Sequence, residues 1–203
     1  MSEMTTPVKK KEDSIAKLGL ILFVITFCVA ALLGVVNSLT KDQIAYQAQL
    51  EIQNAIASIY PEAAETEELS LPESVDPARI SAIYAAYDAE KNVVGYAVAS
   101  SPNGFAGAID LMVGVLPDGT VKSVRVISTN SETPGLGTKV AEDYFITQYD
   151  GIKAPIEVIK NGTPGDSQIL AISGATISSS AVTTGVNLAV DTVMTMEGGA
   201  VVE

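Results

Sequence analysis

Two short segments of the chain combine glycine with small hydroxyl residues, and they hold the side chains that could bind a ligand. The first is residues 131–137, with the sequence Ser-Glu-Thr-Pro-Gly-Leu-Gly. Pro-Gly favours a tight turn, and the two glycines leave backbone N–H groups uncovered, so a planar ligand could lie flat against this loop. An ordinary turn between a strand and a helix has the same composition. The spacing alone leaves a ligand-binding loop and a plain turn as equal alternatives.

The second segment is residues 173–180, Ser-Gly-Ala-Thr-Ile-Ser-Ser-Ser, which directly precedes an apolar helical pattern. Serine and threonine are preferred at helix N-caps, so the segment could simply start a helix with spare hydroxyls. It could also bind an anion, because free N–H groups and the positive end of the helix dipole favour a phosphate, and Gly174 lets the backbone approach closely. A phosphate site alone would not reveal an activity.

The composition excludes most chemistry that a protein performs with its own side chains. The chain has 203 residues and no His, which rules out imidazole general bases, Ser-His-Asp triads and His-ligated metal sites. The single Cys, Cys28, lies in an apolar run, so cysteines of this chain alone cannot form a disulfide, a zinc site or an iron–sulfur cluster. We expect no metal site and no catalytic side chain, and any redox chemistry would come from a cofactor.

The charge argues against one class of partner. With 12 basic and 24 acidic residues the formal net charge is -12. Binding of nucleic acid would need clustered Lys and Arg side chains for the phosphates. We therefore expect no nucleic-acid partner.

An uncharged run near the N-terminus predicts a single transmembrane helix. Residues 18–40 contain no charged side chain, and at about 1.5 Å per residue they give roughly 35 Å of helix, enough to cross a bilayer. A cleaved signal peptide is the alternative, but the run is long for one and no persuasive cleavage site follows it. The positive-inside rule places residues 1–17 in the cytoplasm, so the part of the chain after the span would lie on the outer side of the cell membrane. The basic residues before the span are Lys9, Lys10, Lys11 and Lys17.

Residues 41–79 are predicted to connect the membrane helix to a folded domain. Apolar residues recur there near helical spacing up to Pro61, which indicates an amphipathic stalk. Residues 61–77 contain Pro and many acidic side chains and are typical of a linker. The apolar positions of the stalk are Ile44, Ala48, Ile52, Ala55, Ile56 and Ile59.

The pattern from residue 80 to residue 203 predicts an α+β domain, in which an antiparallel sheet packs on helices. Residues 80–87 and 93–100 form one predicted hairpin, and residues 109–116 and 121–127 form another around a Pro-Asp-Gly-Thr turn. A short helix over 140–149 and a strand over 156–159 follow. The last helix presents an apolar face of Val182, Val186, Ala189, Val190 and Val193.

The glycine-containing motifs carry a resemblance to a known family. They are Asn-Gly-Phe-Ala-Gly at 103–107, Glu-Thr-Pro-Gly-Leu-Gly at 132–137 and Ser-Gly-Ala-Thr at 173–176. In this order they resemble the FMN-binding domain of the G subunit of Rnf electron-transport complexes. They are also similar to the C subunit of the sodium-translocating NADH:quinone reductase. The resemblance covers essentially the whole chain, with residues 80–203 as the FMN-binding domain.

The resemblance implies a covalent flavin. In that family the Thr that ends the tetrad is esterified to the phosphate of FMN by a separate flavin transferase, and the matching residue is Thr176. A phosphoester at Thr176 would place the phosphate beside the helix dipole, and the loop at 132–137 could border the flavin ring. Glu132 could accept hydrogen bonds from the flavin or from the backbone, and capping of a turn is an equal alternative. The cofactor-binding residues implied are Glu132, Thr133, Gly135, Leu136, Gly137, Ser173, Gly174, Ala175 and Ser178.

The function implied is that of an electron-carrier subunit of a membrane-bound ferredoxin:NAD oxidoreductase complex coupled to ion translocation. Its partners would be the other membrane subunits and the flavin transferase, and we expect no independent substrate turnover. Two residues depart from the pattern of the relatives: Phe105 stands where Tyr is common, and Leu170 stands where Asp is common. One alternative is a component of the sodium-translocating quinone reductase. The other is a flavin-free, membrane-tethered assembly domain, and Leu170 favours only this second alternative.

Overall fold

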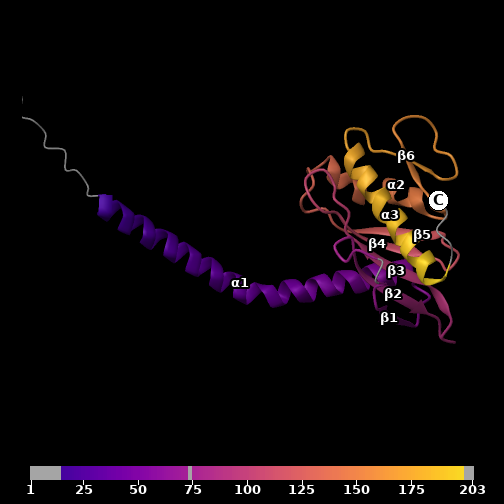
Figure 1. Ribbon diagram of the computed structural model, residues 1–203, viewed down its shortest axis with the longest axis horizontal. Coiled ribbons are helices and arrows are strands. Elements are labelled where there is room, and N and C mark those ends of the chain that lie inside the picture. The colour runs from indigo at the N-terminus through magenta and orange to yellow at the C-terminus, as the bar shows by residue number, and fades with distance from the viewer. Residues whose placement is uncertain (1–14, 73–74, 199–203) are drawn as a thin grey trace, which may run out of the picture. The chain divides into compact units, whose positions relative to one another are not determined.

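The computed structural model describes residues 15–72 and 75–198 (Figure 1). The chain divides into two units, with the boundary in sequence between Gln49 and Leu50. The first unit is helical. Helix α1 runs without a break over Ile15–Ile59, so the predicted membrane span and stalk are one continuous helix. Its apolar side chains from Leu18 to Leu39 are exposed, as they would be in a segment that lipid surrounds. Within residues 15–72 and 75–198, α1 is the one helix long and apolar enough to cross a membrane.

The second unit is built on a five-stranded antiparallel sheet, which confirms the predicted fold class. Its strands are β1 (Glu65–Leu69), β2 (Ile80–Tyr87), β3 (Val93–Ser100), β4 (Asp110–Val115) and β5 (Val121–Ser128), and they lie in sequence order. Both predicted hairpins form, since β2 pairs with β3 and β4 with β5. In the first turn the Asp88 carboxylate accepts hydrogen bonds from the backbone N–H groups of Glu90 and Asn92.

Strand β1 lies inside the segment for which the sequence predicted a linker. It pairs residue for residue with β2, from Glu65 opposite Tyr87 to Leu69 opposite Ile83. Its acidic side chains are exposed because β1 is an edge strand, and Leu69 alone packs against the core. The acidic residues that suggested a linker thus belong to an edge strand. Charged side chains on an edge strand disfavour its pairing with strands of other protein molecules.

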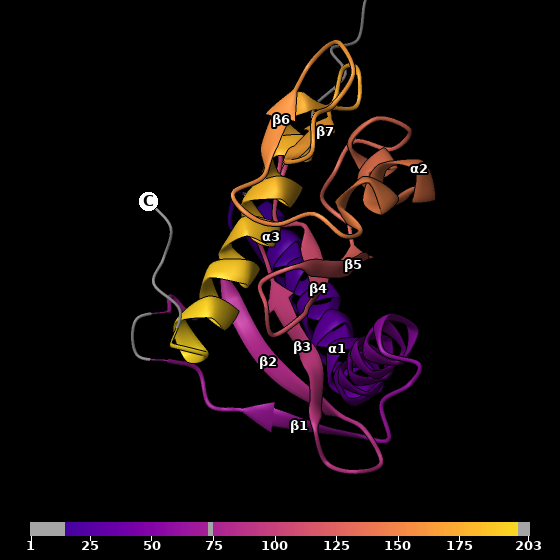
Figure 2. The same cartoon turned by 90° about the vertical axis from the view of Figure 1, so that its right-hand side faces the viewer.

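Helix α3 (Thr176–Met196) crosses one face of the sheet (Figure 2). Its predicted apolar face is confirmed, because Val182, Val186, Ala189, Val190 and Val193 are all buried. They pack on alternate residues of the strands, among them Ile83, Val98 and Val113. This face is the larger hydrophobic core of the domain.

The chain between β5 and α3 departs from the prediction in two places. The single helix expected over 140–149 is three short turns, η1 (Gly137–Ala141), α2 (Asp143–Ile146) and η2 (Thr147–Tyr149), because Glu142 is extended, with φ -74 and ψ 143. The strand expected at 156–159 is β6 (Glu157–Ile159), and it pairs in parallel with β7 (Gln168–Leu170), which the sequence did not indicate.

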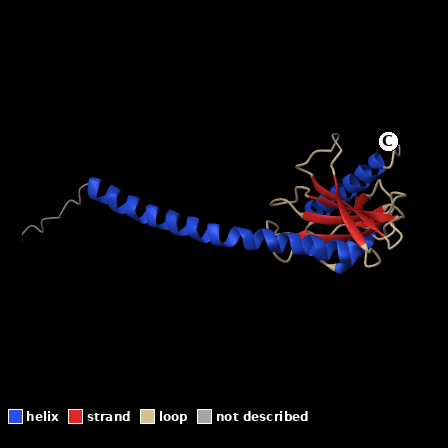
Figure 3. Ribbon diagram, turned by 90° about the horizontal axis from the view of Figure 1, so that it is seen from below, coloured by secondary structure: helices blue, strands red, loops and turns tan. Residues whose placement is uncertain are grey.

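The last turns of α1 cover the opposite face of the sheet, so helices lie on both of its sides (Figure 3). Ile56, Ile59 and Tyr60 are buried against small side chains of β2 and β3, among them Ala86 and Ala97. The Tyr60 hydroxyl lies 3.0 Å from the carbonyl oxygen of Tyr96 and 2.9 Å from that of Val115. Burial raises the pKa of this hydroxyl, so it stays protonated and donates to these carbonyls.

Candidate functional site

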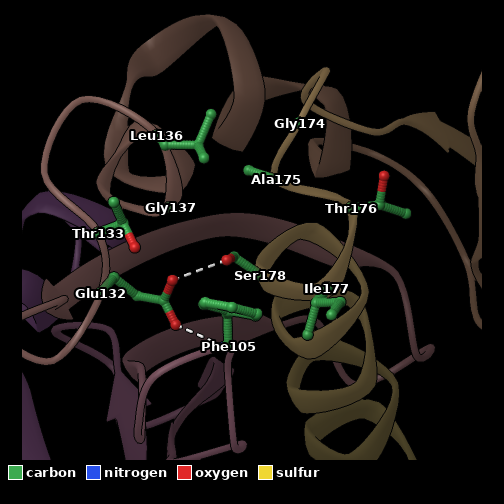
Figure 4. Close-up of a pocket in the computed structure, with 10 residues that line it drawn as sticks. All are labelled: Phe105, Glu132, Thr133, Leu136, Gly137, Gly174, Ala175, Thr176, Ile177 and Ser178. Atoms are coloured by element: carbon green, nitrogen blue, oxygen red, sulfur yellow. Dashed lines mark hydrogen bonds between the residues drawn. The ribbon is translucent and has the colours of Figure 1, made fainter.

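The predicted site residues come together in a pocket of about 230 Å³ at the start of α3 (Figure 4). Three loops or helix ends build it: residues 104–107 before β4, residues 131–137 after β5, and the first turn of α3. All the site residues predicted from the sequence line this pocket except Gly135 and Ser173, which lie outside its lining. The lining residues are Phe105, Glu132, Thr133, Leu136, Gly137, Gly174, Ala175, Thr176, Ile177 and Ser178.

Glu132 joins the three segments. Its side chain is 4% exposed, and its Oε1 accepts hydrogen bonds from the backbone N–H of Phe105 at 2.7 Å and of Ala106 at 3.3 Å. Its Oε2 accepts a hydrogen bond from the Ser178 hydroxyl on α3 at 2.8 Å. Of the roles considered for Glu132, the structure shows the acceptance of backbone N–H groups.

Two glycines give the Glu132 carboxylate its space. A Cβ atom at Gly104 would collide with Glu132 Oε1, and one at Gly137 would collide with Glu132 Oε2. The loop at 104–107 closes on itself through a hydrogen bond of 2.7 Å from Gly104 N to the carbonyl oxygen of Gly107. Gly104 and Gly137 are therefore needed for close packing around a buried carboxylate.

The N-terminus of α3 is open. Gly174 has a φ of +80, which glycine adopts readily, and the Ala175 N–H bonds back to the Ile172 carbonyl at 2.9 Å. Ala175 occupies the N-cap position, and no side chain caps the helix. The segment is thus not a simple Ser or Thr cap. The first N–H groups of a helix have no partner within the helix, so this end offers donors and the positive end of the dipole.

Several other hydroxyls in the first turns of α3 are already engaged in hydrogen bonds. Ser179 Oγ accepts from Ile172 N at 3.0 Å and lies 3.0 Å from the Ala175 carbonyl, which fixes the loop against the helix. Thr183 Oγ1 donates to the Ser179 carbonyl and accepts from the buried Tyr149 hydroxyl at 2.7 Å. Thr176, by contrast, lines the pocket, and its hydroxyl has no hydrogen-bond partner among the residues that the structure describes.

Apolar side chains around the pocket are exposed. Phe105 is 66% exposed, Ile177 56% and Leu136 40%, although each is large and apolar. A cluster of exposed apolar side chains at a pocket marks a surface for a ligand or a partner. Phe105 and Ile177 were not among the predicted site residues, and Phe105 belongs to a motif that carried the resemblance. Its backbone N–H, not its ring, makes the hydrogen bond to Glu132, so the change from Tyr leaves that bond unaffected.

Leu170, the other departure, is the last residue of β7 and does not line the pocket. Its side chain is 36% exposed. The Gln148 side chain holds its backbone, with its Oε1 accepting from Leu170 N at 2.7 Å and its Nε2 donating to the Leu170 carbonyl at 3.3 Å. Over the described parts of the chain, no group of three or more Cys, Asp or Glu side chains could hold a metal ion.

Two family models match the chain. An FMN-binding domain matches residues 104–191, and an RnfG N-terminal region matches residues 1–59. Among similar proteins, the chain is 35% identical over 189 residues to the G subunit of the Na(+)-translocating ferredoxin:NAD(+) oxidoreductase complex of Acetobacterium woodii, covering 86% of this chain and 89% of that protein. It is 34% identical over 186 residues to the G subunit of the ion-translocating oxidoreductase complex of Methanosarcina acetivorans, covering 91% and 97%.

The fold is also that of a solved structure. The C subunit of the Na(+)-translocating NADH-quinone reductase of Parabacteroides distasonis superposes with a TM-score of 0.58 at 18% identity, over 76% of this chain and 94% of that one. This likeness concerns the fold alone, whereas the sequence matches to the two G subunits cover 86% and 91% of this chain. The chain therefore belongs to the family of G subunits of the ion-translocating oxidoreductase, or Rnf, complexes.

Proposed function

We propose that this chain is an electron-carrier subunit of a membrane-bound ferredoxin:NAD oxidoreductase complex and that it carries FMN joined through a phosphoester to Thr176. The observation that carries the proposal is the position of Thr176, which lines the pocket in the first turn of α3 and whose hydroxyl has no hydrogen-bond partner in the described structure. The family membership and the match to an FMN-binding domain support the cofactor. The other subunits of the complex would supply its remaining activities.

The start of α3 fits a phosphate ester. An anion is stabilised at a helix N-terminus by unpaired N–H groups and by the helix dipole. Gly174 and Ala175 precede Thr176 and present little side-chain bulk at this end of the helix. Thr176 would hold the phosphate, and the backbone of the first turn would stabilise its charge.

The apolar rim fits the ring of a flavin. Phe105, Leu136 and Ile177 offer exposed apolar surface next to the pocket. A pocket of about 230 Å³ is smaller than the roughly 300–1,000 Å³ that usually encloses a ligand of drug size, so a bound FMN would stay partly exposed. FMN supplies the acceptance and release of electrons, while the chain supplies position and electrostatics. Partial exposure suits a carrier that exchanges electrons with a neighbouring protein.

Mass spectrometry of tryptic peptides tests the point of attachment. Thr133 is the other pocket hydroxyl without a hydrogen-bond partner in the described residues, and trypsin separates the two threonines. Cleavage at the Lys and Arg residues places Thr133 in peptide 126–139 and Thr176 in peptide 161–203. We expect a gain of FMN less one water on peptide 161–203, with fragmentation placing it on Thr176. An unmodified chain from cells with an active flavin transferase would instead support the flavin-free assembly domain.

The flavin transferase would have to reach Thr176 from the surface. Leu170 offers this enzyme an apolar side chain where relatives commonly have Asp. Because position 170 is on the surface and outside the pocket, the change concerns maturation of the protein and leaves the proposed flavin site intact.

Labelling of single cysteines tests the membrane orientation. We propose that residues 1–17 are cytoplasmic and that the FMN-binding domain is extracytoplasmic, because the Lys residues precede the span. In a Cys28→Ser background, Asn161→Cys places a thiol in an exposed turn, and Ser2→Cys places one in the tail. A membrane-impermeant maleimide added to intact cells or right-side-out vesicles is expected to label position 161 and not position 2. The reverse pattern would show the opposite orientation.

A further inference from the structure

We infer that Glu132 acts on the flavin through its charge and through the loops it positions: a buried carboxylate without a cationic partner keeps the reduction potential of the bound flavin low. The inference deepens the proposed function and rests on FMN occupying the pocket beside Thr176. It assigns to Glu132 a role beyond contact with the cofactor. Glu132 is here a positioning residue, because its bonds go to the protein.

The geometry shows why the charge is present and not neutralised. All three donors to Glu132 are neutral: the N–H groups of Phe105 and Ala106 and the hydroxyl of Ser178. Three donors on two oxygens match an ionised carboxylate, which only accepts. Ion pairs join Lys122 to Glu62 and Lys153 to Asp118, and none within the described residues involves Glu132. The full negative charge remains at the wall of the pocket.

This charge acts strongly because water is excluded from it. Glu132 is 4% exposed, and interactions between charges grow as the effective dielectric constant falls. An electron added to a flavin in the same pocket would be repelled by the carboxylate. The N-terminus of α3 has the opposite sign and would favour the electron. Removal of the carboxylate charge would remove this repulsion and make the flavin easier to reduce.

The carboxylate also sets the shape of the pocket. Three of its roughly four acceptor sites are used by protein donors, so the side chain has little capacity left for the flavin. The donors come from loop 104–107 and from α3, and Glu132 itself lies in loop 131–137. The apolar side chains of Phe105 and Ile177 thus depend on Glu132 for their placement around the pocket.

The test is the midpoint potential of the flavin in the full-length, flavin-loaded chain, measured by spectroelectrochemical titration. Glu132→Gln removes the charge and keeps the size and shape of the side chain. Its amide oxygen can accept the hydrogen bonds from the backbone N–H groups of Phe105 and Ala106. Its amide nitrogen can donate to the Ser178 hydroxyl once that hydroxyl rotates to accept. Glu132→Asp keeps the charge and changes the shape. We expect a positive shift of the potential for Gln and a value near the wild type for Asp.

Glu142→Gln is the matched control, since it removes the same charge from an exposed side chain that does not line the pocket. Water and salt screen an exposed charge, so its shift is expected to be much smaller. Equal shifts in Glu132→Gln and Glu142→Gln, or a shift in Glu132→Asp as large as in Glu132→Gln, would overturn the role of the charge.

A second readout needs no flavin and separates this inference from the proposed function. In the flavin-free chain, hydrogen exchange at the amides of Phe105 and Ala106 is expected to accelerate at least tenfold in Glu132→Ala and to change little in Glu132→Gln. Unchanged exchange in Glu132→Ala would overturn the positioning role. Absence of flavin from the wild-type chain would count against the proposed function, whereas flavin that is present but does not respond to Glu132→Gln would count against this inference.

Discussion

Replacement of Thr176 by Val is expected to abolish covalent flavin in the chain and to leave the fold intact. Val has nearly the same size as Thr and lacks the oxygen that a phosphoester requires. The Thr176 hydroxyl has no hydrogen-bond partner in the described structure, so its removal breaks no hydrogen bond within the described residues. We expect the free energy of unfolding to change by no more than about 0.5 kcal/mol. In-gel flavin fluorescence of the denatured chain and its intact mass are the measurements.

Two control variants make the Thr176 experiment specific. Thr176→Ser keeps a hydroxyl at the start of α3 and is expected to retain covalent flavin. Thr133→Val removes the other free hydroxyl of the pocket and is also expected to retain it. Undiminished fluorescence in Thr176→Val, or its loss in Thr133→Val alone, would move the attachment away from Thr176.

The elements that could be predicted are those whose apolar residues follow a recognisable pattern along their own segment. The strands of both hairpins are largely apolar and end at recognisable turns, and Asp88 and the Pro-Asp-Gly-Thr turn supply that chemistry. The apolar face of α3 repeats with helical spacing and is buried as expected. In each case the pattern within one segment was enough to identify the element.

The elements that could not be predicted depend on contacts with distant residues. Strand β1 has one partly buried side chain, Leu69, and owes its conformation to pairing with β2. Strand β7 has three residues and forms by pairing with β6. The break at Glu142 divides an otherwise helical pattern into short turns. None of these features leaves a periodic signal in its own segment.

The candidate site shows the same division. The motifs and the resemblance they carry indicated the site residues, and the structure brings most of these residues to one pocket. The link between Glu132 and Phe105 joins residues far apart in the chain and has no local signal. The exposure of Phe105 and Ile177 was also hidden, because apolar residues at these positions are as easily interpreted as core. Gly135 is in a predicted motif but does not line the pocket; its φ of +75 indicates a role in turning the loop.

Loss of the Tyr60 side chain is expected to destabilise the domain strongly, because it is one of the largest fully buried side chains. It is 1% exposed, and its ring fills space that Gly95 leaves open, while Ile59 fills the space at Gly114. A Cβ at Gly95 would lie 2.6 Å from the ring carbon Cε1 of Tyr60. Only a glycine at position 95 therefore leaves room for the Tyr60 ring. The Lys122 ammonium lies 4.5 Å from the ring centroid.

Tyr60→Ala is therefore expected to lower the free energy of unfolding by about 3 kcal/mol or more, as replacement of large buried aromatic side chains does. Tyr60→Phe keeps the ring and removes only the hydroxyl that reaches the carbonyls of Tyr96 and Val115, so we expect a loss of about 1 kcal/mol. Tyr144→Ala removes a ring that is 59% exposed and is expected to stay within about 0.5 kcal/mol of the wild type. Urea denaturation of the detergent-solubilised chain measures all three.

The losses of unfolding free energy in Tyr60→Ala and Tyr144→Ala together test where the folded domain begins. The sequence predicts that the folded domain begins at residue 80, which would place Tyr60 in a stalk outside it. The structure packs Tyr60 and the preceding turns of α1 on the sheet face formed by Ala82, Ala86 and Ala97. If Tyr60→Ala destabilises far more than Tyr144→Ala, the last turns of α1 belong to the same folding unit as the pocket, and the domain begins well before residue 80. Equal, small losses would instead support a separable stalk and the boundary at residue 80.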